Sequence, residues 1–266
     1  MRKELWCLVL LATLISSVNM PVYAAESCDS QVIASVGEHF NIKNFNSGDE
    51  NGVIMAATCK TWPFKDNVVI AALAYAADPK EKSDMESKKG LLVLTMDNHS
   101  RTIISSYRDT IEEDAITSVQ QDSFQLDTAR YQLSKDVRAF GLRFRSGAPW
   151  PRGAEHTWDD QLTLFVPSGS ELRPVFKYFM NVQRSLDGSI DAWESASLSI
   201  SIEKTASNGY ADLKISAVIE PGTDIDPRPA TMNMKKRVES FVLHFDDSTY
   251  GTYTPVGNVP WWLDFQ

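Results

Sequence analysis

Short apolar runs separated by polar turns recur along most of the chain. The run at 67–77, NVVIAALAYAA, is nearly continuous and β-branched at its start, which is typical of a buried strand. Residues 91–107 form two apolar runs around the turn DNHS, which is the pattern of a β-hairpin. In 196–219, hydrophobic residues alternate with serine and charged residues on both sides of a polar turn. This alternation predicts two strands that each have one buried and one solvated face.

The hairpin pattern returns at three further places, which are 124–146, 161–180 and 238–256. No long segment with the 3.6-residue period of an amphipathic helix competes with these strands. Residues 113–123, EDAITSVQQDS, are the one stretch with the pattern of a short helix. The sequence therefore predicts an all-β fold of repeated antiparallel hairpins, arranged either as a small β-propeller or as a sandwich.

The beginning of the chain has the order of features of a secretory signal peptide. A basic start precedes an apolar run from Leu5 to Ile15, and small residues occupy a cleavage site that ends at Ala24. The apolar run is too short to cross a bilayer, which takes roughly 20 residues. We therefore predict that residues 1–24 are removed on export to the periplasm. Residues 25–266 then form a single domain without a transmembrane segment.

Cys28 and Cys59 are the two cysteines that follow the predicted cleavage site. Two thiols in an oxidising compartment usually pair, so we predict a disulfide between them. Such a bridge closes a loop of about thirty residues and contributes about 3 kcal/mol in the chain-entropy model. A redox or metal-binding pair is the alternative, but the CxxC spacing and the neighbouring histidine typical of such sites are missing.

The chain is acidic, and its charge limits the classes of partner. The formal net charge is −9, and loss of residues 1–24 removes two basic residues and one acidic residue, which leaves −10. An acidic protein repels phosphate backbones, so nucleic acid is excluded as a partner. A basic protein or a metal ion is favoured instead.

The segment FQLDTARY at 124–131 raises the possibility of an aspartic protease, because Asp127 and a threonine follow a hydrophobic residue. Such an enzyme needs two carboxylates that share a proton, each followed by Thr-Gly or Thr-Ser. Here Ala129 and Arg130 follow, and the chain has no second motif of this kind. We therefore interpret Asp127 as a structural residue, in a turn or paired with Arg130 or Arg138.

Other catalytic motifs are also missing from the sequence. It contains no G-x-S-x-G nucleophile elbow, no H-E-x-x-H zinc motif, no P-loop and no G-x-G-x-x-G. Paired carboxylates are the remaining candidate for catalysis. Asp159 and Asp160 follow Trp158, and Glu171 comes after the next turn. A glycosidase needs two carboxylates about 5–10 Å apart, often with a tryptophan that stacks on the sugar.

A second acidic cluster lies at 187–194, DGSIDAWE, where Asp187, Asp191 and Glu194 surround a glycine turn. Calcium takes six to eight oxygen ligands, and the spacing matches no EF-hand loop. A solvated turn is the default interpretation and a bound calcium ion is the alternative. We predict no other cofactor and no other metal.

The C-terminal segment VPWWLDF places Trp261 next to Trp262. On a strand, adjacent side chains alternate, so one tryptophan faces inward and the other outward. The segment is then a terminal strand that locks the fold, or it presents a patch that docks a partner.

Several motifs together resemble an uncharacterised family of exported proteobacterial β-rich proteins. They are CKTWP (59–63), LDTARYQL (126–133), RAFGLRF (138–144), LTLFVPSGSELRPVF (162–176) and NGYADLKI (208–215). NGYADLKI and the later FDDSTY (245–250) are also similar to the closing blade of propeller-like periplasmic proteins, some of which are lysozyme inhibitors or immunity proteins. The chain departs from the FG-GAP pattern, because no D-x-[DN]-x-D-G calcium loop is complete.

The leading hypothesis is a non-catalytic, protein-binding protein of the periplasm, similar to an inhibitor or an immunity protein. Its partner is a basic periplasmic or envelope protein such as a cell-wall hydrolase, which acidic residues attract electrostatically. The predicted contacts lie in the turns 97–101, 158–160 and 187–194, and they are Trp158, Asp159, Asp160, Asp187, Asp191 and Glu194. The alternative is an enzyme that cleaves cell-wall or surface glycans with Asp159, Asp160 or Glu171 as acid and base.

Overall fold

The structure is a computed structural model, and it describes residues 27–47, 50–83, 88–149, 154–186, 189–223, 235–247 and 251–264. The predicted signal peptide, residues 1–24, lies outside the described residues. In the described ranges, no helix has the length and apolar character needed to cross a membrane.

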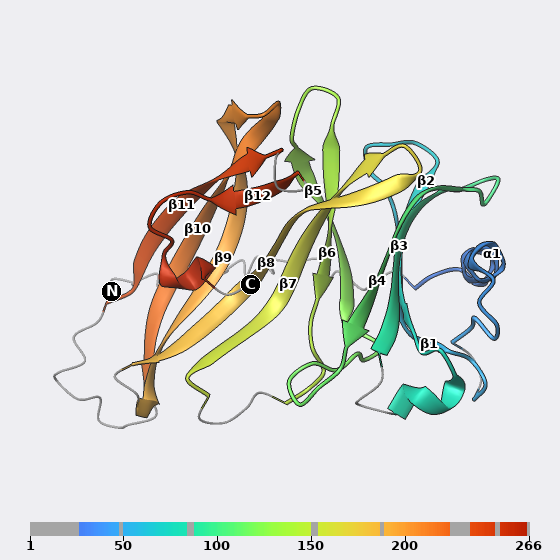
Figure 1. Cartoon of the computed structure of the whole chain (residues 1–266), viewed down its shortest axis with the longest axis horizontal. Helices are drawn as coiled ribbons and strands as arrows, with labels where there is room; N and C mark the ends of the chain where they lie inside the picture. Colours follow the sequence, from blue (N-terminus) through green and yellow to red (C-terminus); the bar gives the residue numbers. More distant parts are fainter. Residues whose placement is uncertain are drawn as a thin grey trace, which may run out of the picture.

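Twelve strands, one α-helix and two short 3-10 helices follow one another along the described chain (Figure 1). In order they are α1 (Ser30–Phe40), β1 (Ile54–Thr61), β2 (Val68–Tyr75), η1 (Pro79–Ser83), β3 (Lys88–Asp97), β4 (Ile103–Glu112), β5 (Phe124–Gln132), β6 (Arg138–Phe144), β7 (His156–Ser168), β8 (Glu171–Leu186), β9 (Ser189–Ser207), β10 (Tyr210–Thr223), β11 (Arg237–Asp246), β12 (Thr252–Pro255) and η2 (Trp261–Leu263).

The strands form three layers that lie side by side, with α1 outside the first layer (Figure 1). Strands β1–β4 make the first layer, β5–β8 the second and β9–β12 the third. One hydrophobic cluster packs α1 on the first layer, a second joins the first layer to the second, and a third joins the second layer to the third. The all-β prediction is confirmed at this level, apart from α1.

Almost every strand pairs with its neighbour in sequence, and these pairs are antiparallel. The exception is β4, which pairs with β8 in parallel through a single residue pair, Ser106 with Glu171. Strand β8 also pairs with β7 and, from Asn181 onward, with β9. The main hydrogen-bonded path ends at β1 and β12, a branch through β7 and β6 ends at β5, and the sheet is not closed.

The burial of each strand explains its sequence pattern. Alternate residues of β2 face opposite clusters: Val69 packs under α1, whereas Ile70 packs against the second layer. A strand covered on both faces has no polar side, and this accounts for the continuous apolar run. Strands β9 and β10 have one solvated face, so buried Leu213 and Ile215 alternate with more exposed polar residues.

The predicted hairpins at 91–107, 124–146, 161–180, 196–219 and 238–256 are all present as antiparallel pairs. The β9–β10 turn is tighter than the sequence suggested, because β9 continues to Ser207. Asn208 and Gly209 both have positive φ, of 49° and 85°. Two left-handed residues, Asn then Gly, are what a two-residue hairpin turn of type I′ requires.

Helix α1 was not predicted, although its boundary signals are in the sequence. The Asp29 side chain accepts a hydrogen bond from Gln31 N at its start, and Asn41 ends it with φ of 52°. The predicted disulfide between Cys28 and Cys59 is present and ties the start of α1 to β1.

The helix predicted over 113–123 is wrong, because side chains take the backbone donors that a helix would use. Asp114 Oδ1 accepts hydrogen bonds from the N–H groups of Ile116 and Thr117 at 2.8 and 2.7 Å. Glu113 accepts one from Val119 N. Local bonds of this kind compete with helical hydrogen bonds.

The tryptophan pair near the C-terminus lies in η2, not in a strand. Trp262 is completely buried against the cluster between the second and third layers, and its indole N–H donates to Glu239 Oε2 at 2.9 Å. Trp261 is partly buried, with the Arg184 guanidinium 4.3 Å from its ring centre. Both tryptophans therefore contribute to closing this core.

Candidate functional site

A cleft opens where the first layer separates from the second. Strands β4 and β8 run parallel from their single pairing at Ser106 and Glu171 and then diverge. Within the described chain, no strand pairs with residues 107–112 of β4 on that side. The space between the layers has a volume of about 270 Å³.

Aromatic side chains form much of the inside of the cleft. Tyr107 of β4 packs on Phe165 of β7, with ring centres 5.2 Å apart. Phe179 of β8 lies farther along, and the Trp158 ring is 5.9 Å from it. Trp158 is 40% exposed, which is high for so large an apolar side chain. Trp158 therefore exposes aromatic surface at the cleft.

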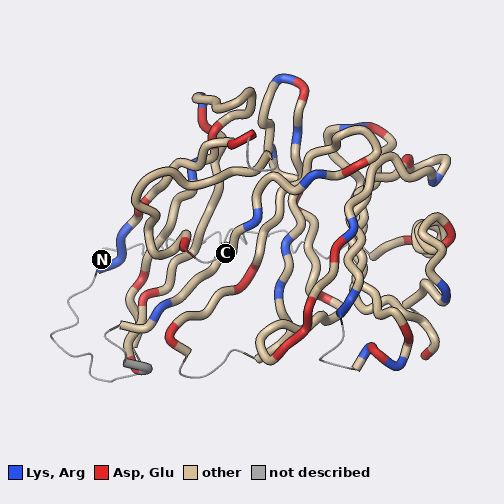
Figure 2. The backbone as a smooth tube through the Cα atoms, in the orientation of Figure 1, with Lys and Arg blue, Asp and Glu red and all other residues tan. Residues whose placement is uncertain are grey.

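Carboxylates surround these rings. Asp109 and Asp159 line the cleft and take part in no salt bridge among the described residues, whereas Glu112 is paired with Lys88. Figure 2 shows acidic positions gathered around the end of β4 and in the loop that follows it. Lys177 on β8 is the lysine that lines this space. Acidic groups therefore outnumber basic ones in the cleft.

The Tyr107 hydroxyl donates to Asp109 Oδ2 at 2.7 Å. Burial of the phenol raises the pKa of Tyr107, and the bond to Asp109 and the charge of that carboxylate raise it further. Tyr107 is therefore a neutral hydrogen-bond donor, and it holds Asp109 in place.

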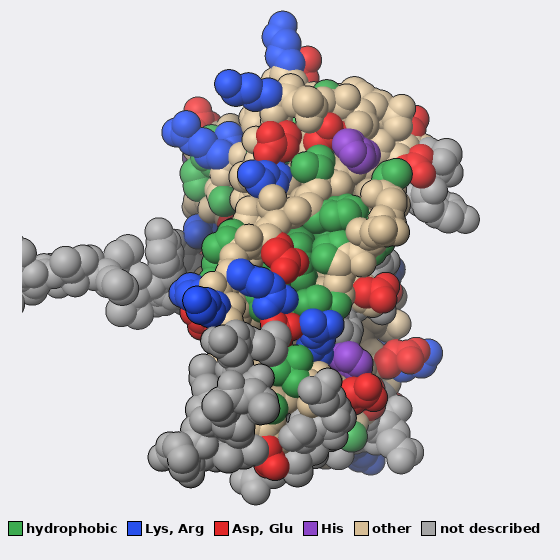
Figure 3. Space-filling model, turned by 90° about the vertical axis from the view of Figure 1, so that its left-hand side faces the viewer, with side chains coloured by type: hydrophobic (Ala, Val, Ile, Leu, Met, Phe, Trp, Pro, Cys, Tyr) green, Lys and Arg blue, Asp and Glu red, His purple; other side chains and the backbone are tan. Residues whose placement is uncertain are grey.

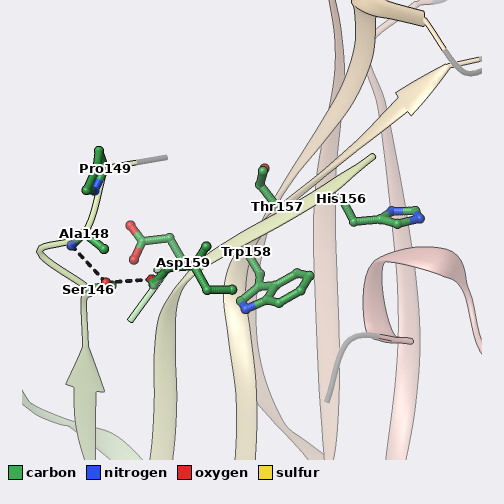
Figure 4. A pocket seen from close by; sticks show the side chains of 8 residues that line it. Ser146, Ala148, Pro149, His156, Thr157, Trp158 and Asp159 are labelled. Carbon is green, nitrogen blue, oxygen red and sulfur yellow. Dashed lines mark hydrogen bonds between the residues drawn. The ribbon is translucent and has the colours of Figure 1, made fainter. Parts of the chain in front are cut away.

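A small recess of about 40 Å³ adjoins the cleft (Figure 4). Residues 156–159 of β7 form one side of it, and the loop after β6 forms the other. The loop is held by Ser146, whose Oγ donates to the Ile116 carbonyl oxygen at 2.8 Å and accepts from Ala148 N at 3.1 Å. Thr157 is buried, and its Oγ1 has no hydrogen-bond partner in the described part of the chain.

The structure places the residues 158–160 inside β7, so the predicted turn at this position is wrong. Trp158 and Asp159 do line the cleft. Asp160 is buried, with φ of 58°, and its carboxylate accepts from Arg143 Nη1 at 2.7 Å and from Arg145 Nε at 3.4 Å. Asp160 is therefore held by two guanidinium groups, although it borders the cleft.

The second acidic cluster is not a shared site. Asp187 lies outside the described residues, and Asp191 is exposed on β9. Glu194 is completely buried, where Arg184 donates to Oε2 at 2.7 and 3.2 Å and Arg237 donates to Oε1. Burial alone would raise the pKa of Glu194, but the bonds from both arginines outweigh it and lower that pKa.

These facts correct the prediction that Glu194 is an exposed contact residue. They also leave its oxygens engaged by arginine, which weakens the calcium alternative. In the described ranges, no three His, Cys, Asp or Glu side chains come together to hold a metal ion.

Glu171 lies far from the other two carboxylates of the glycosidase alternative, Asp159 and Asp160, which both line the cleft. Asp159 pairs with Asn181 of β8, whereas Glu171 begins that strand. Ten residues of extended strand separate Asn181 from Glu171, so Asp159 and Glu171 are about 30 Å apart. A glycosidase requires roughly a third of this distance at most.

Asp127 is structural, but its partner differs from the two predicted. It lies at an irregularity in β5, where Tyr131 donates to Oδ2 at 2.8 Å and Arg143 Nε lies 3.4 Å from the same oxygen. Arg138 instead stacks on Phe64, 3.1 Å from the ring centre.

One cluster was missed by the sequence reasoning. Ser207 Oγ donates to buried Asp212 Oδ1 at 2.7 Å and lies 3.2 Å from His244 Nδ1. A hydrolase triad uses opposite nitrogens of the imidazole for serine and carboxylate. Here both contact Nδ1, with Asp212 at 3.1 Å. The cluster therefore lacks the geometry of a nucleophilic triad.

At the end of the molecule formed by β9–β12, Figure 3 shows hydrophobic, acidic and basic side chains of the described residues intermingled. The cleft between β4 and the second layer, with its adjoining recess, is therefore the candidate functional site. Comparisons with protein-family models, curated proteins and solved structures gave no match to this chain.

Proposed function

We propose that the protein is a non-catalytic binding protein that holds a basic segment of a partner protein in the cleft. The observation that carries this proposal is the combination, in one cleft, of the exposed Trp158 ring with the carboxylates of Asp109 and Asp159, which form no salt bridge among the described residues. Aromatic side chains supply most of the affinity in protein interfaces, and an ammonium or guanidinium group is attracted both to carboxylates and to the face of an indole.

The partner class follows from charge and from the predicted location. An exported chain with a net charge near −10 attracts basic proteins over a long range. We propose a basic envelope protein such as a cell-wall hydrolase, in keeping with the resemblance to lysozyme inhibitors and immunity proteins. The disulfide suits an oxidising compartment such as the periplasm.

The binding mode differs from the one that the sequence suggested. The sequence suggested that acidic turns of this protein enter the active site of the partner. We propose instead that a cleft of this protein receives a segment of the partner. The layer packing that creates this cleft is closer to a sandwich than to a propeller, because a hydrophobic cluster packs each pair of neighbouring layers together.

The test is calorimetric titration of residues 25–266 with a basic lysozyme at low and at high salt. We expect binding that weakens as the salt concentration rises. We also expect Trp158→Ala and Asp159→Asn each to lower the binding affinity by about ten-fold or more, which corresponds to about 1.4 kcal/mol. Val238→Ala and Asp136→Asn are the matched controls, because these exposed residues lie away from the cleft.

Equal losses in the cleft variants and in the controls would contradict the proposed site. Absence of binding to the lysozyme would contradict the hydrolase partner. A screen for glycan cleavage by the same protein then becomes the next experiment.

A further inference from the structure

We propose that the partner segment binds as an added β-strand along the open edge of β4, with a basic side chain at Trp158 and Asp159. This inference rests on the proposed function and specifies how the partner is held. It commits to one occupant, an extended segment of a basic protein.

The direction of the backbone groups of β4 carries the argument. Ser106 N donates to the Ser170 carbonyl oxygen at 3.0 Å, so its N–H points away from β3 and toward β8. Backbone groups alternate in direction along a strand, and the β3–β4 register is unbroken from Ser106 to Glu112. The N–H and carbonyl groups of Arg108, Thr110 and Glu112 therefore point into the opening.

Thr110 supplies an independent check of this direction. Its N–H donates to Asp109 Oδ1 at 2.8 Å, within its own strand segment, and not to the β3 backbone. The Asp109 carboxylate thus accepts the hydrogen bond from the Thr110 N–H group, which is the donor that an added strand would use. An incoming carbonyl replaces this bond, and the carboxylate is then available to a cation of the partner.

The facing edge of β8 is unsuited to the same role. The Ser170 carbonyl points to β4, so by alternation Pro174 also faces this opening. Proline has no N–H to donate, and it is placed on strand edges where no ladder continues. Strand addition is therefore directed to β4 and not to β8.

The side chains of β4 define what the added strand meets. Arg108 stacks on Phe40 of α1, with 5.3 Å from its guanidinium carbon to the ring centre, so the Arg108 side chain faces the helix. Tyr107, Asp109 and Ile111 face the cleft. Alternate side chains of an added strand would enter the cleft, which the carboxylates of Asp109 and Asp159 line.

The recess beside Trp158 accommodates one basic side chain. Its 40 Å³ is room for the end of one side chain, and a single water takes about 10–15 Å³ on this measure. Asp159 supplies the charge and Trp158 an aromatic face (Figure 4). Charge and stacking together select lysine or arginine.

The probe is a fluorescein-labelled peptide, Thr-Val-Thr-Lys-Thr-Val-Thr, whose valines and lysine share one face. Binding to residues 25–266 is followed by fluorescence anisotropy. Two N-methylated versions are compared, one methylated on the Val and Lys residues and one on the inner Thr residues. Strand addition predicts that one version loses at least about ten-fold in affinity and the other binds within about two-fold of the parent.

Two protein variants complete the test. Thr110→Pro removes the N–H on the open edge without removing a β3–β4 bond, and Thr110→Ala keeps that N–H. We expect loss of binding for proline only, with both melting temperatures measured by circular dichroism. A glutamate in place of the lysine in the peptide should abolish binding to the wild-type protein.

Equal effects of the two N-methylation patterns would overturn strand addition while the lysozyme titration still stands. Failure of the parent peptide to bind at millimolar concentration would also overturn it. Because the peptide contacts only the cleft edge, its failure alone does not bear on the lysozyme result. The N-methylated pair keeps the inference falsifiable if Thr110→Pro unfolds.

Discussion

Replacement of Glu194 by glutamine should destabilise the protein far more than the loss of a carboxylate at the surface. The Glu194 carboxylate is completely buried on β9 and joins Arg184 of β8 to Arg237 of β11. Glutamine keeps the volume but removes the charge and turns one acceptor into a donor that faces a guanidinium. The two arginines then lose their shared counter-charge.

The expected magnitude follows from burial. Removal of one partner of a buried ion pair costs about 3–5 kcal/mol. The arginine side chains are 32% and 35% exposed, so water can partly resolvate them. We therefore expect the lower end, about 3 kcal/mol, or about 6–12 °C in Tm for a protein of this size.

Urea unfolding followed by tryptophan fluorescence measures this change. Glu220→Gln is the control, because it also removes one carboxylate from a pair, but both Glu220 and Lys236 are more than half exposed. We expect a loss below about 1 kcal/mol for the control. If Glu194→Gln costs no more than Glu220→Gln, the reasoning about the buried network is wrong.

The pH dependence supplies a second check with a defined sign. The pKa of Glu194 is lowered from 4.5 in the folded protein. Its contribution to stability is therefore fully present above pH 4.5 and declines as the pH falls through the folded-state value. The difference in stability between the wild type and Glu194→Gln should shrink in the same range.

Three further predictions concern stability, each measured by urea unfolding. Replacement of Cys28 and Cys59 by serine should cost about 3–4 kcal/mol for a 31-residue separation, and dithiothreitol should then have no further effect. Gly90→Ala should cost about 1–3 kcal/mol, because the new Cβ would lie 2.3 Å from the Tyr75 ring; a stable variant would contradict this packing. Gly209→Ala should cost about 1–2 kcal/mol from its positive φ alone, since nothing lies within 4 Å.

Much of the fold could be predicted from the sequence because its strands pair locally. The pattern of apolar runs and polar turns located five hairpins, and the cysteine pair was evident from the predicted compartment. Helix α1 was missed because Val32, Ile33 and Val36 are β-branched, and its helical spacing spans only eleven residues. At 113–123 the apolar spacing suggested a helix, but Asp114 uses the backbone donors of the next turn.

The candidate site was predictable only in part. Trp158 and Asp159 stood out by residue type, and both line the cleft. Asp160 and Glu194 are paired with arginines from other strands, and a single sequence does not show which residues those strands bring together. The cleft itself depends on the point at which β4 leaves β8, which is a property of long-range packing.

The nearly sequential strand pairing has a consequence for the order in which the chain folds. Apart from β1 and β5, each strand pairs with one that precedes it in the chain, so β1 to β4 can assemble before later residues are available. Contacts between neighbours in sequence cost little loop-closure entropy and form quickly. Strand β8 is the one member that returns to an earlier strand, at Ser106, and the second and third layers also meet along it. Completion of β8 therefore marks the step at which an N-terminal β-meander becomes part of the stacked molecule.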